Sequence, residues 1–185
     1  MAITGDKFTQ NPLQKTQKIF QVAQIFLRIL AFATALTATC LMVTNKQSTV
    51  IFGIEIDAKY SYSSAFKFFA LANAVACAFC VVSLFLAFFL ARQGSINPST
   101  YFLLFLHDLM MMGLVLAACA AATAIGYVGQ YGNRHTGWVS ICNQFGKFCR
   151  RSTISVVLSY LSFISLLLLS VISAYMSRHY HSIPL

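Results

Sequence analysis

The sequence predicts an all-α membrane protein, a bundle of four transmembrane helices. Three observations carry this prediction. Of the 185 residues, 58% are hydrophobic and only 9% are charged, which gives a mean hydropathy of +0.73; a water-soluble domain of this size carries far more surface charge. Seventeen residues are Phe. Four apolar segments are each long enough to cross a hydrocarbon core of about 30 Å, which takes roughly 20 residues of helix.

The four predicted spans follow one another closely and form one transmembrane domain over residues 20–176. They cover about residues 20–44, 65–91, 101–128 and 153–176. In the first span, "ATA" at residues 33–35 resembles the cleavage site of a signal peptide, but Arg28 interrupts the apolar stretch that such a peptide needs. We therefore expect a retained helix. Between the second and third spans, the Gly, Asn and Pro of "RQGSINPST" (residues 92–100) are typical of a tight turn.

The chain is strongly basic, with 13 Lys and Arg against four Asp and Glu and a formal net charge of +9. Because the basic residues are spread along an apolar chain, we interpret this charge as contact with anionic lipid headgroups. No basic stripe or nucleic-acid-binding motif occurs, so we expect no nucleic-acid partner. There is also no phosphate-binding Gly loop and no Ser/His/Asp arrangement. The sequence therefore predicts a protein without enzymatic activity, cofactor or metal.

Four spans place both termini on one side of the membrane, and two signals disagree about which side. The count of Lys and Arg favours cytoplasmic loops. Cys142 and Cys149, the only cysteines outside the spans, favour the opposite orientation. A bridge between them closes a loop of about eight residues, stabilises by roughly 2.5 kcal/mol, and persists only on an oxidising side. Zinc is the alternative, but there is no second Cys pair or His pair. We expect the disulfide, with residues 1–19 and 177–185 as cytoplasmic tails.

Two opposite charges lie inside predicted spans at matching depth. With both termini in the cytoplasm, the first and third spans run in the same direction. Arg28 lies nine residues past Ile19, roughly 13 Å along a helix, and Asp108 lies seven residues past Tyr101, roughly 10 Å. An unpaired charge deep in a bilayer costs about 2.5–3.5 kcal/mol, and the guanidinium fork matches a carboxylate. We therefore expect Arg28 to pair with Asp108, within one protomer or between two.

Small residues recur every four positions on three of the spans. Counting 100° per residue, one row lies on the side of Arg28 and another on the face of the third span opposite Asp108. Small residues let membrane helices approach closely, so packing within the protomer and contact with another protomer are both open for these rows. They are Ala31 and Ala35 in the first span, Ala70, Ala74 and Ala78 in the second, and Gly113, Ala117 and Ala121 in the third.

These features together resemble the plant CASP-like proteins, relatives of the Casparian strip membrane domain proteins. The family carries an Arg in its first span and an Asp in its third. The loop "GNRHTGWVSICNQFGKFCRR" (residues 132–151) is the more specific match, and "SSAFKFFALANAVAC" (residues 63–77) is also similar to the family pattern. In this loop the residues at the family's Asn, Trp, Phe and paired Cys positions are Asn133, Trp138, Phe148, Cys142 and Cys149.

The resemblance implies a MARVEL-like four-span protein of the plasma membrane, with cytoplasmic termini, that forms homodimers, heterodimers or larger oligomers. Strip-forming members assemble into an immobile platform and recruit enzymes that polymerise lignin in the wall. The first loop, residues 45–64, lacks the signature of those members. We therefore expect a non-enzymatic scaffold that contacts lipids and recruits plasma-membrane or cell-wall proteins, rather than Casparian strip formation itself.

A small channel or transporter, or a subunit that modulates one, is the alternative function. Arg28, Asp108 and His107 are polar groups inside the membrane. They cluster in one leaflet, however, and no span is broken at mid-membrane by Pro or by paired Gly. We expect His107 to bond to a neighbouring helix. Cys77 and Cys80 have the C-x-x-C spacing of redox motifs, but on an apolar helix they are expected to be packing residues.

Overall fold

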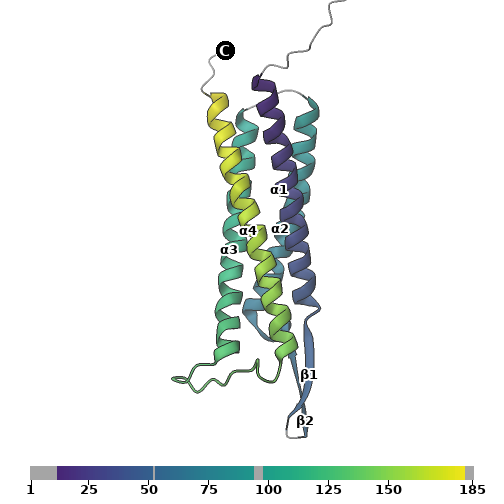
Figure 1. Ribbon diagram of the computed structural model, residues 1–185, viewed down its shortest axis with the longest axis vertical. Coiled ribbons are helices and arrows are strands. Elements are labelled where there is room, and N and C mark those ends of the chain that lie inside the picture. Colours follow the sequence, from purple (N-terminus) through teal and green to yellow (C-terminus); the bar gives the residue numbers. More distant parts are fainter. Residues whose placement is uncertain (1–11, 52, 94–97, 182–185) are drawn as a thin grey trace, which may run out of the picture.

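The computed structural model describes residues 12–51, 53–93 and 98–181, which form four long antiparallel helices (Figure 1). α1 begins and α4 ends at one end of the bundle, whereas a β-hairpin and an irregular loop join helices at the other end. The helices are α1 (Pro12–Val43), α2 (Ser64–Gln93), α3 (Pro98–Tyr131) and α4 (Gly146–His181).

Each helix corresponds to one predicted span; α2, α3 and α4 extend beyond theirs at both ends, whereas α1 begins before its span and ends one residue short of it, at Val43. All four are long and apolar enough to cross a membrane. α1 and α3 both begin at a Pro, which suits the first helical position because its missing N–H would have no partner there. α4 begins at Gly146, several residues before the apolar run at Thr153. Hydropathy marks the membrane-embedded part of a helix, whereas its backbone hydrogen bonds continue into the aqueous layer.

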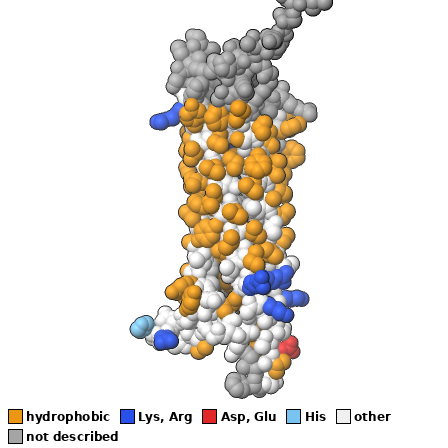
Figure 2. All heavy atoms as spheres, viewed as in Figure 1, with side chains coloured by type: hydrophobic (Ala, Val, Ile, Leu, Met, Phe, Trp, Pro, Cys, Tyr) orange, Lys and Arg blue, Asp and Glu red, His pale blue; other side chains and the backbone are white. Residues whose placement is uncertain are grey.

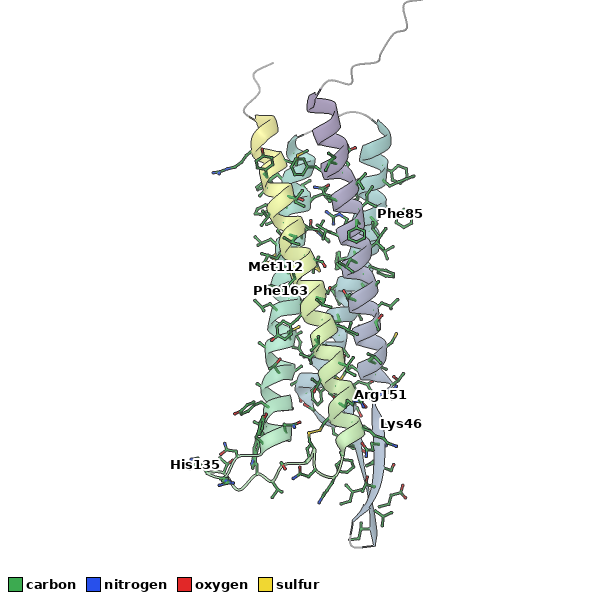
Figure 3. The ribbon with its side chains drawn as sticks, in the orientation of Figure 1. Lys46, Phe85, Met112, His135, Arg151 and Phe163 are labelled. Atoms are coloured by element: carbon green, nitrogen blue, oxygen red, sulfur yellow. A yellow bond between two sulfur atoms is a disulfide. The ribbon has the colours of Figure 1, made fainter. Side chains whose placement is uncertain are left out.

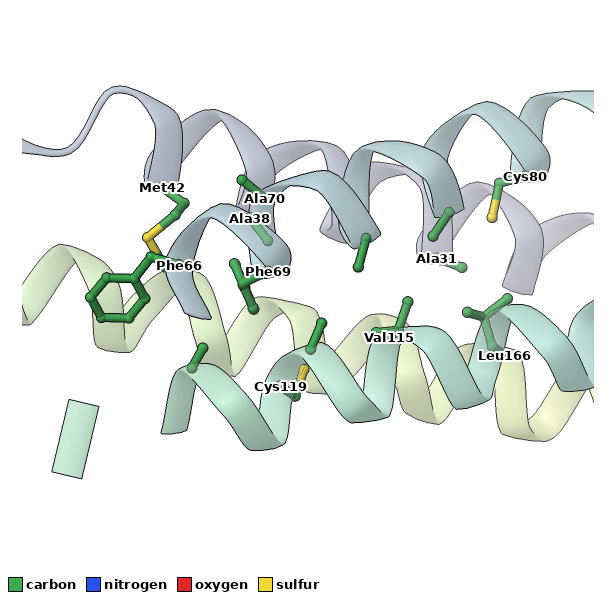
Figure 4. Close-up of a cluster of buried hydrophobic side chains, with 14 of the residues drawn as sticks. Ala31, Ala38, Met42, Phe66, Phe69, Ala70, Cys80, Val115, Cys119 and Leu166 are labelled. Atoms are coloured by element: carbon green, nitrogen blue, oxygen red, sulfur yellow. The ribbon is translucent and has the colours of Figure 1, made fainter. Parts of the chain in front are cut away.

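The bundle places α1 and α3 across its diagonal. α1 packs mainly against α2 and α4, and α3 packs mainly against the same two helices. The interior is lined mostly by small and medium apolar side chains such as Ala31, Val115 and Leu166, together with the larger Phe69 (Figure 4). Each of these four residues is at most 1% exposed. Small residues inside a membrane bundle let the helix backbones approach closely.

Large apolar side chains form the outside of the bundle. Figure 2 shows them as a continuous band over the helices, with Lys and Arg side chains gathered below it at the hairpin end. Phe85, on the outer face of α2 in Figure 3, is 61% exposed, whereas Met112 and Phe163 are partly buried against the core. This arrangement, apolar outside and small or polar inside, is the one that a hydrocarbon solvent requires.

The first inter-helix loop corrects the all-α prediction, because it folds into a β-hairpin. β1 (Lys46–Ile51) pairs antiparallel with β2 (Ile54–Lys59), from Lys46 opposite Lys59 to Ile51 opposite Ile54. The signal is present in the sequence: two runs rich in β-branched residues flank Gly53, whose φ of 81° favours glycine. A 3-10 turn (Tyr60–Tyr62) leads into α2. Lys59 donates a hydrogen bond to Asp57 and holds the pKa of that carboxyl below its ordinary value.

The small-residue rows divide between the inside and the outside of the protomer. Ala31, Ala35 and Ala70 are buried. The other members face outward or lie on the flank: Ala74, Ala78, Gly113 and Ala117 are exposed and Ala121 is half-buried. Each step of four residues rotates a position by about 40° around the helix. A row that starts on a buried face therefore reaches the exposed side after one or two steps. Packing inside the protomer therefore does not account for the exposed members.

Candidate functional site

A bidentate ion pair lies in the centre of the bundle. Arg28 Nη1 donates to Asp108 Oδ1 at 2.9 Å, and Arg28 Nη2 donates to Asp108 Oδ2 at 2.8 Å. The two residues come from α1 and α3, which face each other across the diagonal, so the long Arg side chain bridges the bundle interior. Both residues are fully buried. The structure thus brings together, within one protomer, the two charges that the sequence analysis paired.

Ser83 of α2 is a third member of this site. Its hydroxyl donates to the carbonyl of Cys80 at 3.0 Å, and its oxygen accepts a hydrogen bond from Arg28 Nη1 at 2.8 Å. The guanidinium therefore connects α1, α2 and α3. A buried charge pair is tolerated when its geometry is good and further hydrogen bonds engage its donors. Both Nη atoms of Arg28 meet this condition, whereas its buried Nε has no hydrogen-bond partner among the described residues.

His107 lies beside the pair rather than bonding to a neighbouring helix. Its Nδ1 is 3.3 Å from Asp108 Oδ1 on the same helix. Its ring packs against Phe79 of α2, with the ring centroids 5.4 Å apart. His107 therefore contacts the neighbouring helix only through its ring, against Phe79, whereas its polar contact is to the adjacent Asp108. The 100° between neighbours on a helix does not keep these side chains apart, because the imidazole turns back toward the carboxylate.

A row of buried serines on α4 forms a second polar element, which the sequence analysis did not identify. Ser155 Oγ donates to the carbonyl of Ala38 at 2.6 Å, and Ser162 Oγ donates to that of Ala31 at 3.1 Å. These bonds attach α4 directly to the backbone of α1, which small residues on α1 make accessible. The buried serines of α4 are Ser152, Ser155, Ser159, Ser162, Ser165, Ser170 and Ser173. Their spacing of three to five residues in an apolar run was the available signal.

Ser159 of α4 connects Asn73 of α2 with Cys119 of α3. Asn73 Nδ2 donates to the carbonyl of Phe69 within α2 at 2.9 Å, and its Oδ1 accepts from Ser159 of α4 at 2.7 Å. The thiol of Cys119 on α3 lies 3.1 Å from Ser159 Oγ. Cys77 and Cys80 are also buried, as expected for packing residues. Among the described residues, no group of three or more His, Cys, Asp or Glu could hold a metal ion.

The loop between α3 and α4 carries the second candidate site. Cys142 and Cys149 form a disulfide, with their Cα atoms 5.7 Å apart. The bond joins this loop to the first turn of α4. The backbone N–H groups of Ile141 and Cys142 both donate to the carbonyl of Gly129, at 3.0 and 3.2 Å, and so attach the same segment to the last turn of α3. The loop is therefore held to both helices that it connects.

Asn133 and Trp138, two of the loop residues in the family pattern, pair with each other. Asn133 N–H donates to the Trp138 carbonyl at 2.8 Å, and Trp138 N–H donates back at 3.0 Å. Asn133 Oδ1 also accepts from the N–H of His135 at 3.1 Å. Gly132, which ends α3 with a φ of 69°, is needed here because a Cβ would lie 2.5 Å from the Trp138 carbonyl oxygen.

Phe148 joins the two loops. It is 4% exposed, and its ring packs edge-on against Phe66 of α2. Its N–H donates to Gln47 Oε1 of β1 at 2.8 Å, and its carbonyl accepts from Asn45 Nδ2 at 2.8 Å. The two loops therefore form one connected cap at this end of the bundle.

The cap presents apolar side chains on its outside. Trp138 is 60% exposed, and the neighbouring Val139 is 82% exposed. The Asn133–Trp138 pairing and the disulfide on either side fix the backbone that carries them. Because the backbone of this segment is already fixed, binding costs little further backbone entropy. The segment is therefore suited to contact with a membrane interface or a protein partner.

Comparisons with known proteins place the chain among similar sequences. The family model of the Casparian strip membrane protein domain matches residues 17–165. "CASP-like protein 1F1" of Vitis vinifera is 56% identical over 178 residues, which cover 96% of this chain and 86% of that protein. The protein of the same name from Ricinus communis is 57% identical over 176 residues (95% and 97%), and that from Arabidopsis thaliana 38% over 157 residues (85% and 90%). No solved structure matches.

The ion pair predicts a strong and specific effect of Asp108→Asn. This substitution leaves the Arg28 charge buried without its counter-ion, which destabilises proteins by about 3–5 kcal/mol. We expect a large fall in the thermal unfolding temperature of the detergent-solubilised protein. Asp57→Asn, the same substitution on the exposed hairpin, is the matched control and should change little. Equal unfolding temperatures for the two variants would contradict the structural role of the pair.

Proposed function

This chain belongs to the Casparian strip membrane protein domain family, and we propose that it is a non-enzymatic plasma-membrane scaffold. In this role it assembles with copies of itself or with related four-span proteins into homodimers, heterodimers or larger oligomers. The assembly organises a membrane domain and holds partners such as cell-wall-modifying enzymes. The family and the four apolar helices make it an integral, multi-pass membrane protein.

The observation that carries the proposal is that the intramembrane ion pair closes within one protomer. Asp108 accepts from both Nη atoms of Arg28 within one chain. A protomer therefore needs no charge from a neighbour in order to fold in a membrane, and it can enter different assemblies unchanged. The same pairing argues against transport, because Arg28 already neutralises the carboxylate that would attract a cation.

The outer face of α3 supplies a surface for assembly. Gly113 and Ala117 are exposed on the side of α3 opposite Asp108, and a Cβ added at Gly113 meets no atom within 4 Å. Small residues spaced four apart on an outer helix face favour close packing of two membrane helices. We assign this face to contact with a second protomer. Many weak contacts of this kind, repeated in an array, give high avidity.

The proposed orientation places the cap outside the cell and both tails in the cytoplasm, as in MARVEL-like proteins. It rests on the disulfide, because such a bond persists only on an oxidising side of the membrane. The exposed Trp138 and Val139 then face the cell wall or the outer membrane surface. This segment is the proposed contact with recruited proteins.

A membrane-impermeant maleimide tests this orientation in intact plant cells. We expect Cys142 and Cys149 to stay unlabelled at first and to react after mild reduction at the cell surface, because the disulfide is then opened outside the cell. Labelling that requires permeabilised cells would reverse the orientation. Labelling of both thiols before reduction would show that the disulfide is absent.

Fluorescence recovery after photobleaching tests the scaffold. We expect the tagged protein to recover slowly in discrete patches, and Ala117→Phe to recover faster because the larger side chain separates the α3 faces. Ala33→Phe, at an exposed position of α1, is the control for added bulk. Fast and complete recovery of the unaltered protein over the whole cell surface would contradict the scaffold and would favour transport assays in liposomes.

A further inference from the structure

A cavity of about 560 Å³ lies between the last turns of α3 and the first turns of α4. It is at the end of the bundle that carries the disulfide. Its volume falls in the range of about 300–1,000 Å³ that is typical of small-molecule sites. Neither the ion pair nor the outer face of α3 borders it, so the cavity is separate from the features on which the scaffold proposal rests.

Small residues on α3 create this space. Ala122, Gly126 and Gly129 form the α3 wall, and a Cβ built at Gly126 meets no atom within 4 Å. Val156 and Tyr160 line the α4 side, and the disulfide borders the end nearest the cap. Almost all of these groups are apolar, so the walls favour a hydrocarbon occupant.

The cavity opens sideways into the membrane. Tyr127 of α3 and Val157 of α4 line it and are 63% and 54% exposed. Both belong to helical segments that are long and apolar enough to cross a membrane. Because its mouth faces the bilayer, hydrocarbon can enter from the membrane without crossing water.

The deep end of the cavity requires no polar ligand group. Thr123 Oγ1 donates to the Cys119 carbonyl at 2.7 Å, so its single proton is committed there. Tyr160 OH lies 3.2 Å from Thr123 Oγ1 and must therefore donate to it. The two hydroxyls thus satisfy each other. A polar end of the occupant belongs at the other end, near Cys149, about 16 Å away along eleven residues of α4.

Basic charge lies at that shallow end. Arg150 is exposed and precedes Thr153 and Val157, both lining residues, by three and seven positions, which places it on the same face of α4. After Asp108 the sequence contains no Asp or Glu. No carboxylate of the loop or of α4 can therefore neutralise Arg150. A guanidinium at a membrane surface without a carboxylate partner is suited to a lipid phosphate.

We propose that the cavity holds one acyl chain of a membrane phospholipid and that Arg150 contacts the headgroup phosphate. The chain lies between α3 and α4 with its end toward Thr123 and Tyr160. The lipid fills the space that the small residues of α3 leave open, and its headgroup lies beside the disulfide-bonded cap.

Photocrosslinking tests this site. The purified protein is placed as single copies in nanodiscs that contain phosphatidylcholine or diacylglycerol with a diazirine in one acyl chain, and labelled peptides are mapped by mass spectrometry. We expect the phosphatidylcholine probe to label residues 122–130 and 153–160 about tenfold more strongly than the phosphate-free diacylglycerol probe, the ratio that one charge-assisted hydrogen bond confers. Equal labelling by the two probes would overturn the proposal, and this comparison needs no variant.

Matched variants locate the chain and the headgroup. Gly126→Leu should fill the cavity and abolish labelling, whereas Gly113→Leu, on the opposite face of α3 and equally free of clashes, should not. Arg150→Gln should reduce phosphatidylcholine labelling to the level of diacylglycerol. Arg151→Gln, half a turn around α4 from Tyr160, removes the same charge and should have no such effect. Labelling that persists in Gly126→Leu, or a loss that is equal for both Arg variants, would contradict the assigned site.

Discussion

The bidentate ion pair between Arg28 and Asp108 is the constraint on which the rest of the bundle depends. In a hydrocarbon solvent neither charge can face outward, so α1 and α3 must turn these residues toward each other. Because α1 and α3 lie across the diagonal, their pairing fixes the depth and rotation of both helices. α2 then contributes Ser83 to the guanidinium, and α4 closes the bundle with its serines.

This interior explains the character of the exterior. Once the polar groups are paired inside, the outer surface can be entirely apolar and still contain short rows of small residues such as Gly113 and Ala117. Lipid covers such a surface in a single protomer, and another helix covers it in an assembly. The cap at the disulfide end is held just as firmly, because Phe148 connects both loops and the disulfide attaches the second loop to α4. A rigid unit with apolar sides suits the proposed scaffold.

The sequence was sufficient to predict the features that follow from one large free-energy cost, that of an unpaired charge in the membrane. Charges inside apolar spans must pair, and counting the rise per residue placed Arg28 and Asp108 at one depth. It could not predict features set by rotation and by tertiary contact. Ala74 and Ala78 leave the buried face of α2 because a four-residue step drifts around the helix. The β-branched residues on both sides of Gly53 indicate the hairpin, and the spacing of the serines in α4 indicates a buried row. In so apolar a chain, however, hydropathy is the dominant signal, and it predicts only the helical spans.

A double-mutant cycle on the ion pair tests the central claim most directly. The free energy of unfolding is measured for the unaltered protein, Arg28→Gln, Asp108→Asn and the double variant in the same micelles. If the pair holds the bundle, each single variant leaves a buried charge alone, and the double variant, which has no charge there, recovers about 3 kcal/mol relative to the sum of the single losses. Losses that simply add would contradict the account, because they would mean that the two residues stabilise the bundle independently.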